Sequence, residues 1–256
     1  MNIVACFKLV PEEQDIIVNG DRTLNLEKAT PKISLYDLNA VEAATELAAA
    51  MPDSKVSALS VGGKILENSK ARKDILSRGP DALYAVIDPA LESALPRETA
   101  AALAAAVGKI GSYDLIICGE GSGDLYAQQV GLLLGSLLSV PVINEVSKIT
   151  AGDGKVTVER TLETEVEVLE VPLPAVVCVT ADINTPKIPS MKAILAAGKK
   201  PITVWSVTDI GASTGGAPVV MQSILAPAQA DRKKVIVEGD SDDKVAAFVE
   251  SLRKVL

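Results

Sequence analysis

The segment of the chain best suited to chemistry is a glycine-rich loop. Gly119-Glu120-Gly121-Ser122-Gly123-Asp124 follows the apolar run 113–118 and precedes a helix-forming stretch at 127–138. Glycines let backbone N–H groups approach an anion, and the start of a helix adds a partial positive charge. Ser122 can donate to a phosphate, and Asp124 suits a ribose hydroxyl, an amide or a helix N-cap. The pattern indicates either a nucleotide site or an ordinary tight turn before a capped helix.

This loop matches neither of two common phosphate-binding motifs. A Walker loop ends in Gly-Lys-Ser/Thr, and a dinucleotide fingerprint follows the first strand. Gly62-Gly63 offers a second close-approach turn or an ordinary one. Lys8, just after the first predicted strand, is a candidate phosphate contact or a side chain that reaches solvent. The acidic residues Glu163, Glu165, Glu167 and Glu170 indicate the solvated face of a hairpin rather than a metal site.

Composition excludes several other kinds of chemistry. The chain has no histidine, so neither a histidine-based triad nor a histidine-ligated zinc site is available. Its three cysteines, Cys6, Cys118 and Cys178, lack metal-ligand spacing and are expected to be reduced core residues of a cytoplasmic protein. A net charge of -8 argues against a nucleic-acid partner. No apolar run approaches the roughly 20 residues that span a bilayer, and the start of the chain does not resemble a signal peptide.

Strand and helix patterns alternate along the chain. Apolar strand candidates at 3–7, 55–61, 82–87 and 113–118 are separated by helix patterns at 38–51, 65–78 and 97–110. This alternation predicts an α/β fold with a doubly wound, mostly parallel sheet. Two runs, 156–160 and 165–171, alternate polar and apolar residues and predict a β-hairpin insertion. The apolar run 175–180 is expected to rejoin the sheet.

The last fifty residues have a different character. We expect a main nucleotide-binding domain over 1–205 and a linker with an extended C-terminal arm over 206–256. The arm is predicted to hold a short strand at 235–237 and a closing helix at 242–254, capped by Ser241 or Asp240. Residues 208–234 carry too little apolar material for a core. The arm is therefore expected to cover another surface, either of its own domain or of a partner.

A basic loop with exposed apolar residues precedes the arm. Lys187, Lys192, Lys199 and Lys200 are interleaved with apolar residues, and the segment is expected to form an exposed loop and a short helix. Apolar surface loops are unusual without a covering partner. The segment is therefore either a docking site or a loop packed on its own domain. The candidate docking residues are Lys187, Ile188, Met191, Lys192 and Ile194.

Several segments, in this order, resemble the electron transfer flavoprotein beta subunit family. The segments are Val158-Glu159-Arg160 with Glu163 and Glu167, Leu173-Pro174-Ala175-Val176-Val177, Asn184-Thr185-Pro186, and Ile188-Pro189-Ser190-Met191-Lys192-Ala193-Ile194. The resemblance spans essentially the whole chain. Four further segments are similar to the Fix-type branch of enterobacteria and to the YdiQ-like group within it: Glu13-Gln14-Asp15, Lys32-Ile33-Ser34, Leu76-Ser77-Arg78-Gly79-Pro80 and Asp124-Leu125-Tyr126-Ala127-Gln128-Gln129-Val130-Gly131.

The resemblance implies a fold like that of the adenine-nucleotide alpha hydrolases and an electron carrier without catalysis of its own. An alpha subunit would supply most of the redox FAD site, and an acyl-CoA-type dehydrogenase would exchange electrons with the pair. This chain would bind AMP or a second FAD. The implied nucleotide contacts are Cys6, Ser34, Leu35, Tyr36, Asp37, Val61, Gly119, Glu120, Gly121, Ser122, Gly123, Asp124, Leu125, Tyr126, Ala127, Gln128, Gln129 and Val130.

One departure from the family pattern falls in the nucleotide loop. Ordinary members carry consecutive Asp residues there and bifurcating members carry Asp-Gly-Asp-Thr, whereas here Leu125-Tyr126 follows Asp124. The departure leaves the bound nucleotide open, and we hypothesise that Tyr126 stacks on the adenine. The main alternative is a stand-alone ATP-binding protein or ligase of the same fold. A purely structural subunit with an empty site is the other alternative.

Overall fold

The computed structural model describes residues 1–212, 219–228 and 234–255. These residues form two compact units. The first comprises Met1–Ile17 and Asn25–Gln222, and the second comprises Val18–Leu24 and Ser223–Leu256. The larger unit contains the sheet and is described first.

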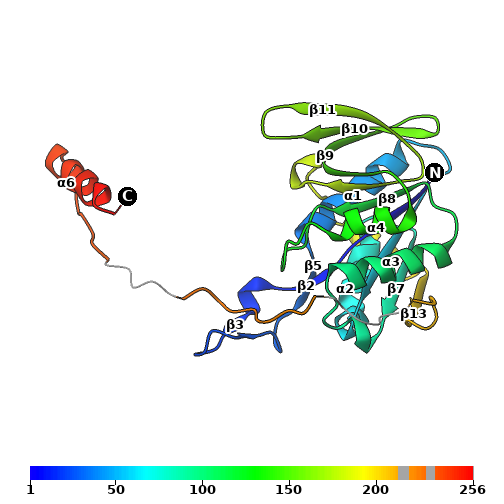
Figure 1. Ribbon diagram of the computed structural model, residues 1–256, viewed down its shortest axis with the longest axis horizontal. Helices are drawn as coiled ribbons and strands as arrows, with labels where there is room; N and C mark the ends of the chain where they lie inside the picture. The colour runs from blue at the N-terminus through cyan, green and yellow to red at the C-terminus, as the bar shows by residue number, and fades with distance from the viewer. Residues whose placement is uncertain (213–218, 229–233, 256) are drawn as a thin grey trace. The chain divides into compact units, whose positions relative to one another are not determined.

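A nine-stranded sheet forms the centre of the larger unit (Figure 1), with the strand order β11-β10-β9-β12-β8-β1-β6-β7-β13. Every pairing from β9 to β13 is parallel, whereas β10 is antiparallel to both β9 and β11. The α/β fold and the hairpin insertion predicted from the sequence are therefore confirmed. The strands are β1 (Asn2–Cys6), β6 (Lys55–Gly62), β7 (Ala82–Ile87), β8 (Leu115–Gly119), β9 (Val142–Ala151), β10 (Lys155–Thr161), β11 (Val166–Pro172), β12 (Ala175–Val179) and β13 (Ile202–Trp205).

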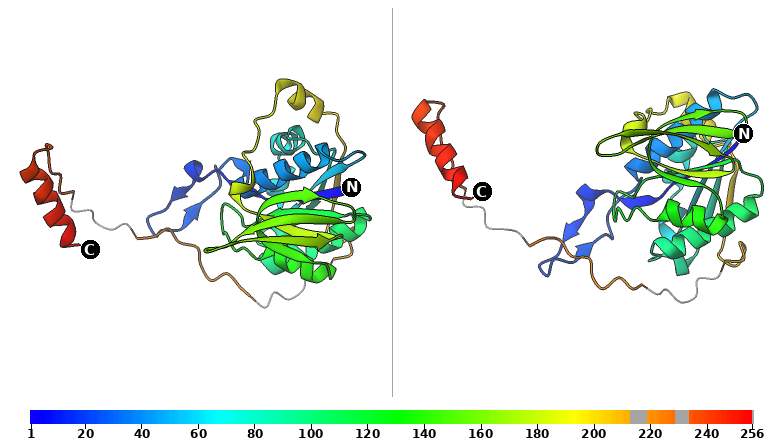
Figure 2. Two further views of the ribbon diagram at one scale, coloured as in Figure 1. Left: turned by 90° about the horizontal axis from the view of Figure 1, so that it is seen from above. Right: turned by 45° about the horizontal axis from the view of Figure 1, so that its top comes forward.

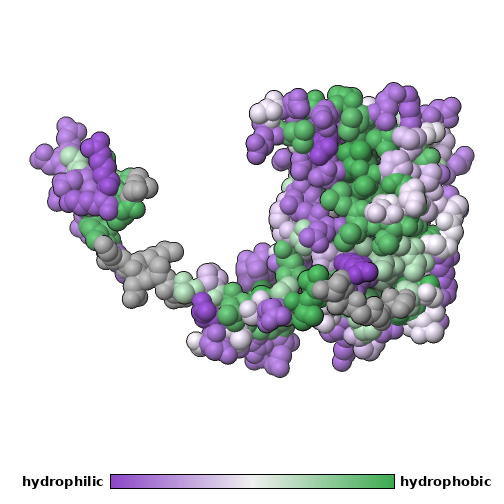
Figure 3. All heavy atoms as spheres, viewed as in Figure 1, coloured by the Kyte–Doolittle hydropathy of each residue, from purple (hydrophilic) through white to green (hydrophobic). Residues whose placement is uncertain are grey.

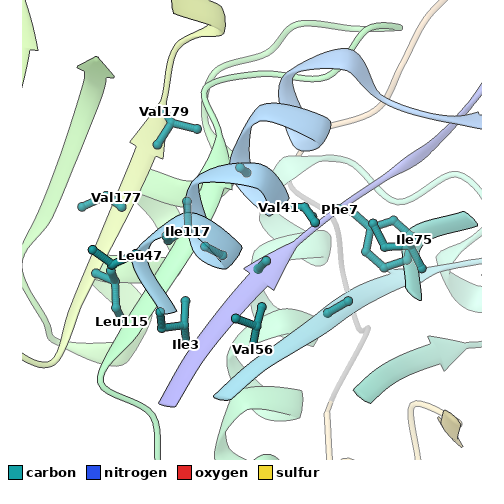
Figure 4. Close-up of a cluster of buried hydrophobic side chains, with 14 of the residues drawn as sticks. Ile3, Phe7, Val41, Leu47, Val56, Ile75, Leu115, Ile117, Val177 and Val179 are labelled. Carbon is teal, nitrogen blue, oxygen red and sulfur yellow. The ribbon is translucent and has the colours of Figure 1, made fainter. Parts of the chain in front are cut away.

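Helices cover both faces of this sheet (Figure 2). On one face, α1 (Leu35–Ala49) and α2 (Ser69–Ser77) pack against strand residues such as Ile3 and Ile117. On the other, α3 (Pro96–Ile110) and α4 (Val130–Leu138) pack against Val4 and Ile116. Adjacent residues of one strand thus belong to opposite cores, as the period of two requires. Figure 4 shows side chains of α1, β1, β8 and β12 meeting in the first of these cores.

The chain reverses its direction of travel across the sheet beside β1. From β1 it passes through α1 to β6 and through α2 to β7, and then α3 carries it back to β8 on the other side of β1. The connections of β1 and β8 therefore leave in opposite directions. Open α/β sheets bind ligands in the crevice at the carboxyl ends of two such strands. In this chain those ends are Cys6 and Gly119.

Three predicted elements differ in the structure. The helix expected from residue 127 begins at Val130, because Tyr126 and Gln128 have φ values of 45° and 55° that no α-helix accommodates. The helix expected at 65–78 is divided into a 3₁₀ turn, Lys64–Glu67, and α2, whose N-cap Asn68 accepts the N–H of Ala71. Residues 235–237 are not a strand, because within the described chain no strand pairs with them.

Several short elements were not expected from the sequence. After β1, β2 (Leu9–Pro11) pairs antiparallel with β5 (Pro31–Ile33), and β3 (Ile17–Val18) pairs with β4 (Leu24–Asn25). By contrast, the short helix predicted for the basic loop is confirmed as α5 (Met191–Ala197). Three further 3₁₀ turns are Glu13–Asp15, Pro89–Leu91 and Ala181–Ile183. The β2–β5 pair brings the residue before α1 back to the end of β1.

The smaller unit contains an isolated bridge and one helix. Thr23 pairs with Leu225, and the N–H of Ala226 donates to the carbonyl of Arg22 at 2.9 Å. The helix α6 (Asp242–Arg253) has no buried residue. Ser241 takes the expected N-cap position, although its hydroxyl makes no capping hydrogen bond. In the parts of the chain that the structure describes, no helix is both long and apolar enough to cross a membrane.

Candidate nucleotide-binding crevice

An ion pair joins the two strand ends that bound the crevice. Lys8 follows β1, and Asp124 lies in the loop after β8. The Lys8 Nζ atom is 2.7 Å from Asp124 Oδ2 and 2.8 Å from Oδ1. Partial burial raises the pKa of Asp124, but the hydrogen bonds from Lys8 and Ser122 outweigh this and bring it below its usual range. The Lys8 side chain remains 44% exposed, so its ammonium group is accessible to an anion from solvent.

Asp37, on the first turn of α1, lies beneath this ion pair. Its Oδ2 accepts the N–H of Lys8 at 2.7 Å, and its carboxyl also accepts the N–H of Gly119. Burial disfavours the charged carboxylate and raises its pKa to about 7, against the opposing effect of these hydrogen bonds. A Cβ on Gly119 would lie 2.7 Å from Asp37 Oδ1. Glycine is therefore required where β8 meets α1.

Ser34 connects the start of α1 with the glycine loop. Its N–H donates to the carbonyl of Lys8 at 3.0 Å, and its buried hydroxyl oxygen accepts the N–H of Gly123 at 3.2 Å. The hydroxyl consequently makes no capping bond to its own helix. Lys8, Ser34 and Gly123 are far apart in the sequence, and these two bonds hold them together at one edge of the sheet.

Two tyrosines lie beside the loop. The ring of Tyr126 is 5.0 Å from the ring of Tyr36, centroid to centroid, and its hydroxyl donates to Glu120 Oε1 at 2.9 Å. Partial desolvation and the bond to Glu120 raise the pKa of Tyr126 to about 12, so the phenol stays protonated at neutral pH. A Cβ on Gly121 would overlap the Tyr126 ring. Tyr126 as a whole is 43% exposed.

Backbone donors are available in the same loop. Within the described residues, the N–H groups of Gly121, Ser122 and Asp124 donate to no protein acceptor, whereas Glu120, Leu125 and Tyr126 donate to protein oxygens. Backbone amides and an ammonium group suit a phosphate, and an aromatic ring suits a base. The loop thus combines a cation, backbone donors and an aromatic side chain, and its interpretation as a nucleotide site stays a prediction.

The other predicted nucleotide contacts range from buried to exposed. Cys6 is buried at the end of β1, and a hydrogen bond between its sulfur and the Cys118 thiol, together with burial, raises the pKa of Cys118 well above its usual range. Val61, near the end of β6, is partly buried and packs against the core that includes α3. Gln128 donates to the Tyr126 hydroxyl at 3.3 Å. Leu35 and Leu125 are exposed, and Ala127, Gln129 and Val130 complete the segment that leads into α4.

Gly62-Gly63 does not offer a second ligand turn. The Glu92 carboxylate accepts the N–H of Lys64 at 2.9 Å, and a Cβ on Gly63 would overlap it. The turn is thus filled by a side chain of the protein, as in the alternative interpretation. Conversely, sequence reasoning missed Thr180, directly after β12. Its buried hydroxyl has no partner among the described residues, and a Thr at a strand end is the only signal that marks it.

The candidate docking residues lie on the segment from Asn184 to α5. Ile188 is 94% exposed and Met191 is 73% exposed, and Ile194 and Lys192 are also at the surface. Lys187 instead pairs with Glu42 at 2.5 Å and with Glu46 at 3.0 Å. The segment therefore presents apolar side chains outward, while one of its lysines is bound within the chain.

Lys200 is also bound within the chain. Its Nζ donates to the carbonyls of Leu76, Gly79 and Pro80, at 2.9, 3.1 and 2.6 Å. These are carbonyls at the end of α2, which a cation stabilises. The interpretation of the basic segment as a loop packed on its own domain thus holds for Lys187 and Lys200, and the interpretation as free surface holds for Ile188 and Met191.

The chain was compared with models of protein families. A family model described as the electron transfer flavoprotein domain matches residues 23–210, more than half of the chain. The matched region contains α1, the glycine loop, the hairpin and the docking segment. It ends before the second part of the smaller unit.

Proposed function

We propose that this chain, which belongs to the electron transfer flavoprotein family, is the beta subunit of a two-chain electron carrier. The observation that carries the proposal is the crevice between β1 and β8, where Lys8, three free loop amides and two tyrosines suit an adenine nucleotide. In this proposal an alpha subunit holds most of the redox FAD. The chain itself is not an enzyme and works in the cytoplasm as a member of the Fix-type branch.

The nucleotide on this chain is AMP or the AMP portion of a second FAD. Both place an adenine, a ribose and a phosphate in the crevice. Lys8 and the amides of Gly121 and Ser122 would hold the phosphate, Asp124 the ribose, and Tyr126 the base. A bound flavin supplies reversible electron transfer, and the protein supplies binding and electrostatics. Every group named here binds or orients, which agrees with a chain that lacks histidine.

The helix α6 is proposed to bind the alpha subunit. Its apolar residues Val245, Phe248, Val249 and Leu252 recur at helical spacing and are all exposed. A second exposed apolar surface lies on the larger unit, where Figure 3 shows an apolar band over the hairpin and α4. Its exposed residues are Leu132, Leu137, Val166 and Val168. Exposed apolar surfaces of this kind indicate that another subunit binds to the chain.

The segment 184–195 is proposed to dock an acyl-CoA-type dehydrogenase. Ile188, Met191 and Leu195 expose apolar surface, and Met adapts to partners of different shape. Lys192 is exposed and adds a positive charge. We expect Lys192→Glu to slow reduction by the dehydrogenase, with Lys192→Arg as the matched control. An unchanged rate for both variants would exclude Lys192 from the contact.

One experiment tests the central proposal. The chain is co-expressed with the flavoprotein encoded beside its gene, the complex is purified, and its absorbance spectrum and released nucleotides are recorded. We expect a yellow two-chain complex with FAD and, on this chain, AMP or a second FAD. A colourless monomer that hydrolyses ATP would instead establish a stand-alone ATP-binding protein.

A further inference from the structure

The first half of α1 carries an unusual set of buried polar residues. Ser34 at its N-cap position, together with Asp37, Asn39 and Glu42, is at most 7% exposed. Ser34 and Asp37 bind the crevice, through Gly123 and through Lys8. Asn39 and Glu42 face a different segment. Buried polar groups are retained where they have specific partners, so the partners of these two residues indicate their role.

Asn39 binds the start of the docking segment. Its Nδ2 donates to the carbonyls of Asn184 and Ala181 at 2.8 and 3.2 Å and lies 3.1 Å from Asn184 Oδ1. In return, Asn184 Nδ2 donates to the carbonyl of Asn39 at 3.0 Å. Two side-chain amides thus satisfy each other's backbones across 145 residues of sequence. This arrangement fixes where the segment leaves the sheet.

Glu42 binds the same segment three residues further on. Its Oε2 accepts the backbone N–H of Lys187 at 3.2 Å, and its Oε1 accepts the Lys187 ammonium at 2.5 Å. The Glu42 side chain is 6% exposed, whereas that of Lys187 is 71% exposed. Hydrogen bonds from Lys187 to Glu42 and Glu46 raise the pKa of Lys187 to about 12. Arg78 adds a longer contact, from Nη1 to the carbonyl of Lys187 at 3.4 Å.

We propose that Asn39 and Glu42 are positioning residues for the docking segment 184–195, and that Lys187 acts as the internal partner of Glu42 rather than as a contact to the dehydrogenase. The docking role of the segment rests on the proposed function, but the positioning does not. The buried carboxylate of Glu42 requires a cation, and Lys187 is the residue that supplies it. Pairing fixes the backbone just before Ile188 and so aims the apolar side chains outward.

Hydrogen exchange on the chain alone tests the positioning. We expect Glu42→Gln and Lys187→Gln each to raise amide exchange in 184–195 by about tenfold, since both release the same local contact. The double variant should be no faster than either single variant, because the two residues form one interaction. Lys187→Arg should restore slow exchange, and exchange in β1 and β8 should stay unchanged. Unchanged exchange in 184–195 in both single variants would overturn the proposal.

Reduction kinetics with the dehydrogenase separate positioning from direct contact. Under the proposal, Glu42→Gln and Lys187→Gln raise KM for the dehydrogenase equally, by roughly tenfold, and leave kcat unchanged. If Lys187 touched the dehydrogenase directly, Lys187→Gln would raise KM while Glu42→Gln would not, and the proposal would fail. A dehydrogenase that reduces no variant, the unaltered chain included, would count against the proposed function. The exchange result would still decide the positioning.

Discussion

Lys8 and Asp124 form an ion pair between the segments that follow β1 and β8, with Nζ 2.7 Å from Oδ2, although they are 116 residues apart in the sequence. They meet because β1 and β8 are neighbours whose connections leave in opposite directions. Both side chains are partly exposed, so the pair itself contributes about 0–1 kcal/mol to stability. The ion pair therefore matters less for the stability of the fold than for placing Lys8 next to the glycine loop.

Replacing Lys8 should weaken nucleotide binding through the phosphate. A hydrogen bond to a charged group contributes about 1.5–3 kcal/mol, so we expect Lys8→Met to lower AMP affinity by at least about tenfold. Calorimetric titration measures the loss, and Lys8→Arg is the control that keeps the charge. Adenosine, which has no phosphate, should bind both variants equally. If Lys8→Met left AMP affinity intact, the phosphate would lie elsewhere.

Removing the Tyr126 ring should release the nucleotide. Base–aromatic stacking contributes about 1–3 kcal/mol, so Tyr126→Ala is expected to purify with less bound nucleotide. Tyr126→Phe keeps the ring and loses only the hydrogen bond to Glu120, so this variant should retain the nucleotide. Nucleotide released by denaturation is quantified for each variant. Unchanged content in Tyr126→Ala would exclude stacking on the adenine.

Much of the fold was predictable because its signals are local. The strand Leu115–Gly119 is a continuous apolar run, as burial on both faces requires. The alternating residues of β10 and β11 predicted their pairing. Glu170 pairs with Lys155 on the exposed face, whereas Glu167, on the face of the buried Val171, pairs with Arg160, so the solvated face predicted for the acidic residues holds only in part. The strand predicted at 235–237 failed for the opposite reason. Propensity alone does not make a strand where no neighbour pairs with it.

The site was predictable in outline but not in its contacts. Glycines after β8 marked the loop, and the alternation of elements marked the sheet edge. The positive φ of Tyr126 carries no sequence signal, since Tyr rarely adopts it. The pairing of Lys187 with Glu42 spans 145 residues and depends on how α1 lies against the docking segment. Charge patterns alone made Lys187 resemble a free docking residue.

The stability of the chain should respond to the ionisation of Asp37. Its folded pKa of about 7 lies above the ordinary value of 3.8, so the folded state keeps a proton that the unfolded state releases. The contribution of Asp37 to the free energy of unfolding is therefore largest below about pH 4. It falls as pH rises to about 7, by up to about 1.4 kcal/mol per pH unit.

Asp37→Asn removes that ionisation and isolates its effect. Asn loses one acceptor for the amides of Lys8 and Gly119, which is a penalty at every pH. Urea unfolding of both proteins between pH 4.5 and 8 gives the difference in free energy of unfolding. As pH rises to 7, we expect the unaltered chain to lose stability relative to the Asp37→Asn variant. Parallel curves would mean that Asp37 is already ionised at low pH.

Charging the apolar face of α6 should prevent assembly without unfolding the chain. Phe248 and Leu252 are more than 40% exposed, so Phe248→Asp or Leu252→Asp should leave the melting temperature unchanged. Each should weaken binding to the alpha subunit by at least about tenfold, as expected when an aromatic or apolar contact is lost. Pull-down with the tagged alpha subunit measures this. Lys244→Glu, on the same helix, is the control, and equal losses for all three variants would indicate helix disruption.

A methyl group on Gly131 should destabilise the larger unit. Gly131 lies on the first turn of α4, and a Cβ there would overlap Cys178 Sγ of β12. Overpacking of this kind costs about 1–3 kcal/mol, so Gly131→Ala should lower the urea midpoint. Adding Cys178→Ala removes the sulfur and should recover most of the loss. The control is Gly108→Ala in α3, where a Cβ meets no atom within 4 Å.

The control variant, Gly108→Ala, should change the urea midpoint in the opposite direction. Ala is favoured over Gly in a helix by about 0.8–1.0 kcal/mol, so Gly108→Ala is expected to raise the midpoint. Opposite signs for two identical substitutions would show that contact with Cys178, and not helix propensity, decides the effect at Gly131. If Gly131→Ala were as stabilising as Gly108→Ala, α4 would have to lie further from β12 than the structure places it.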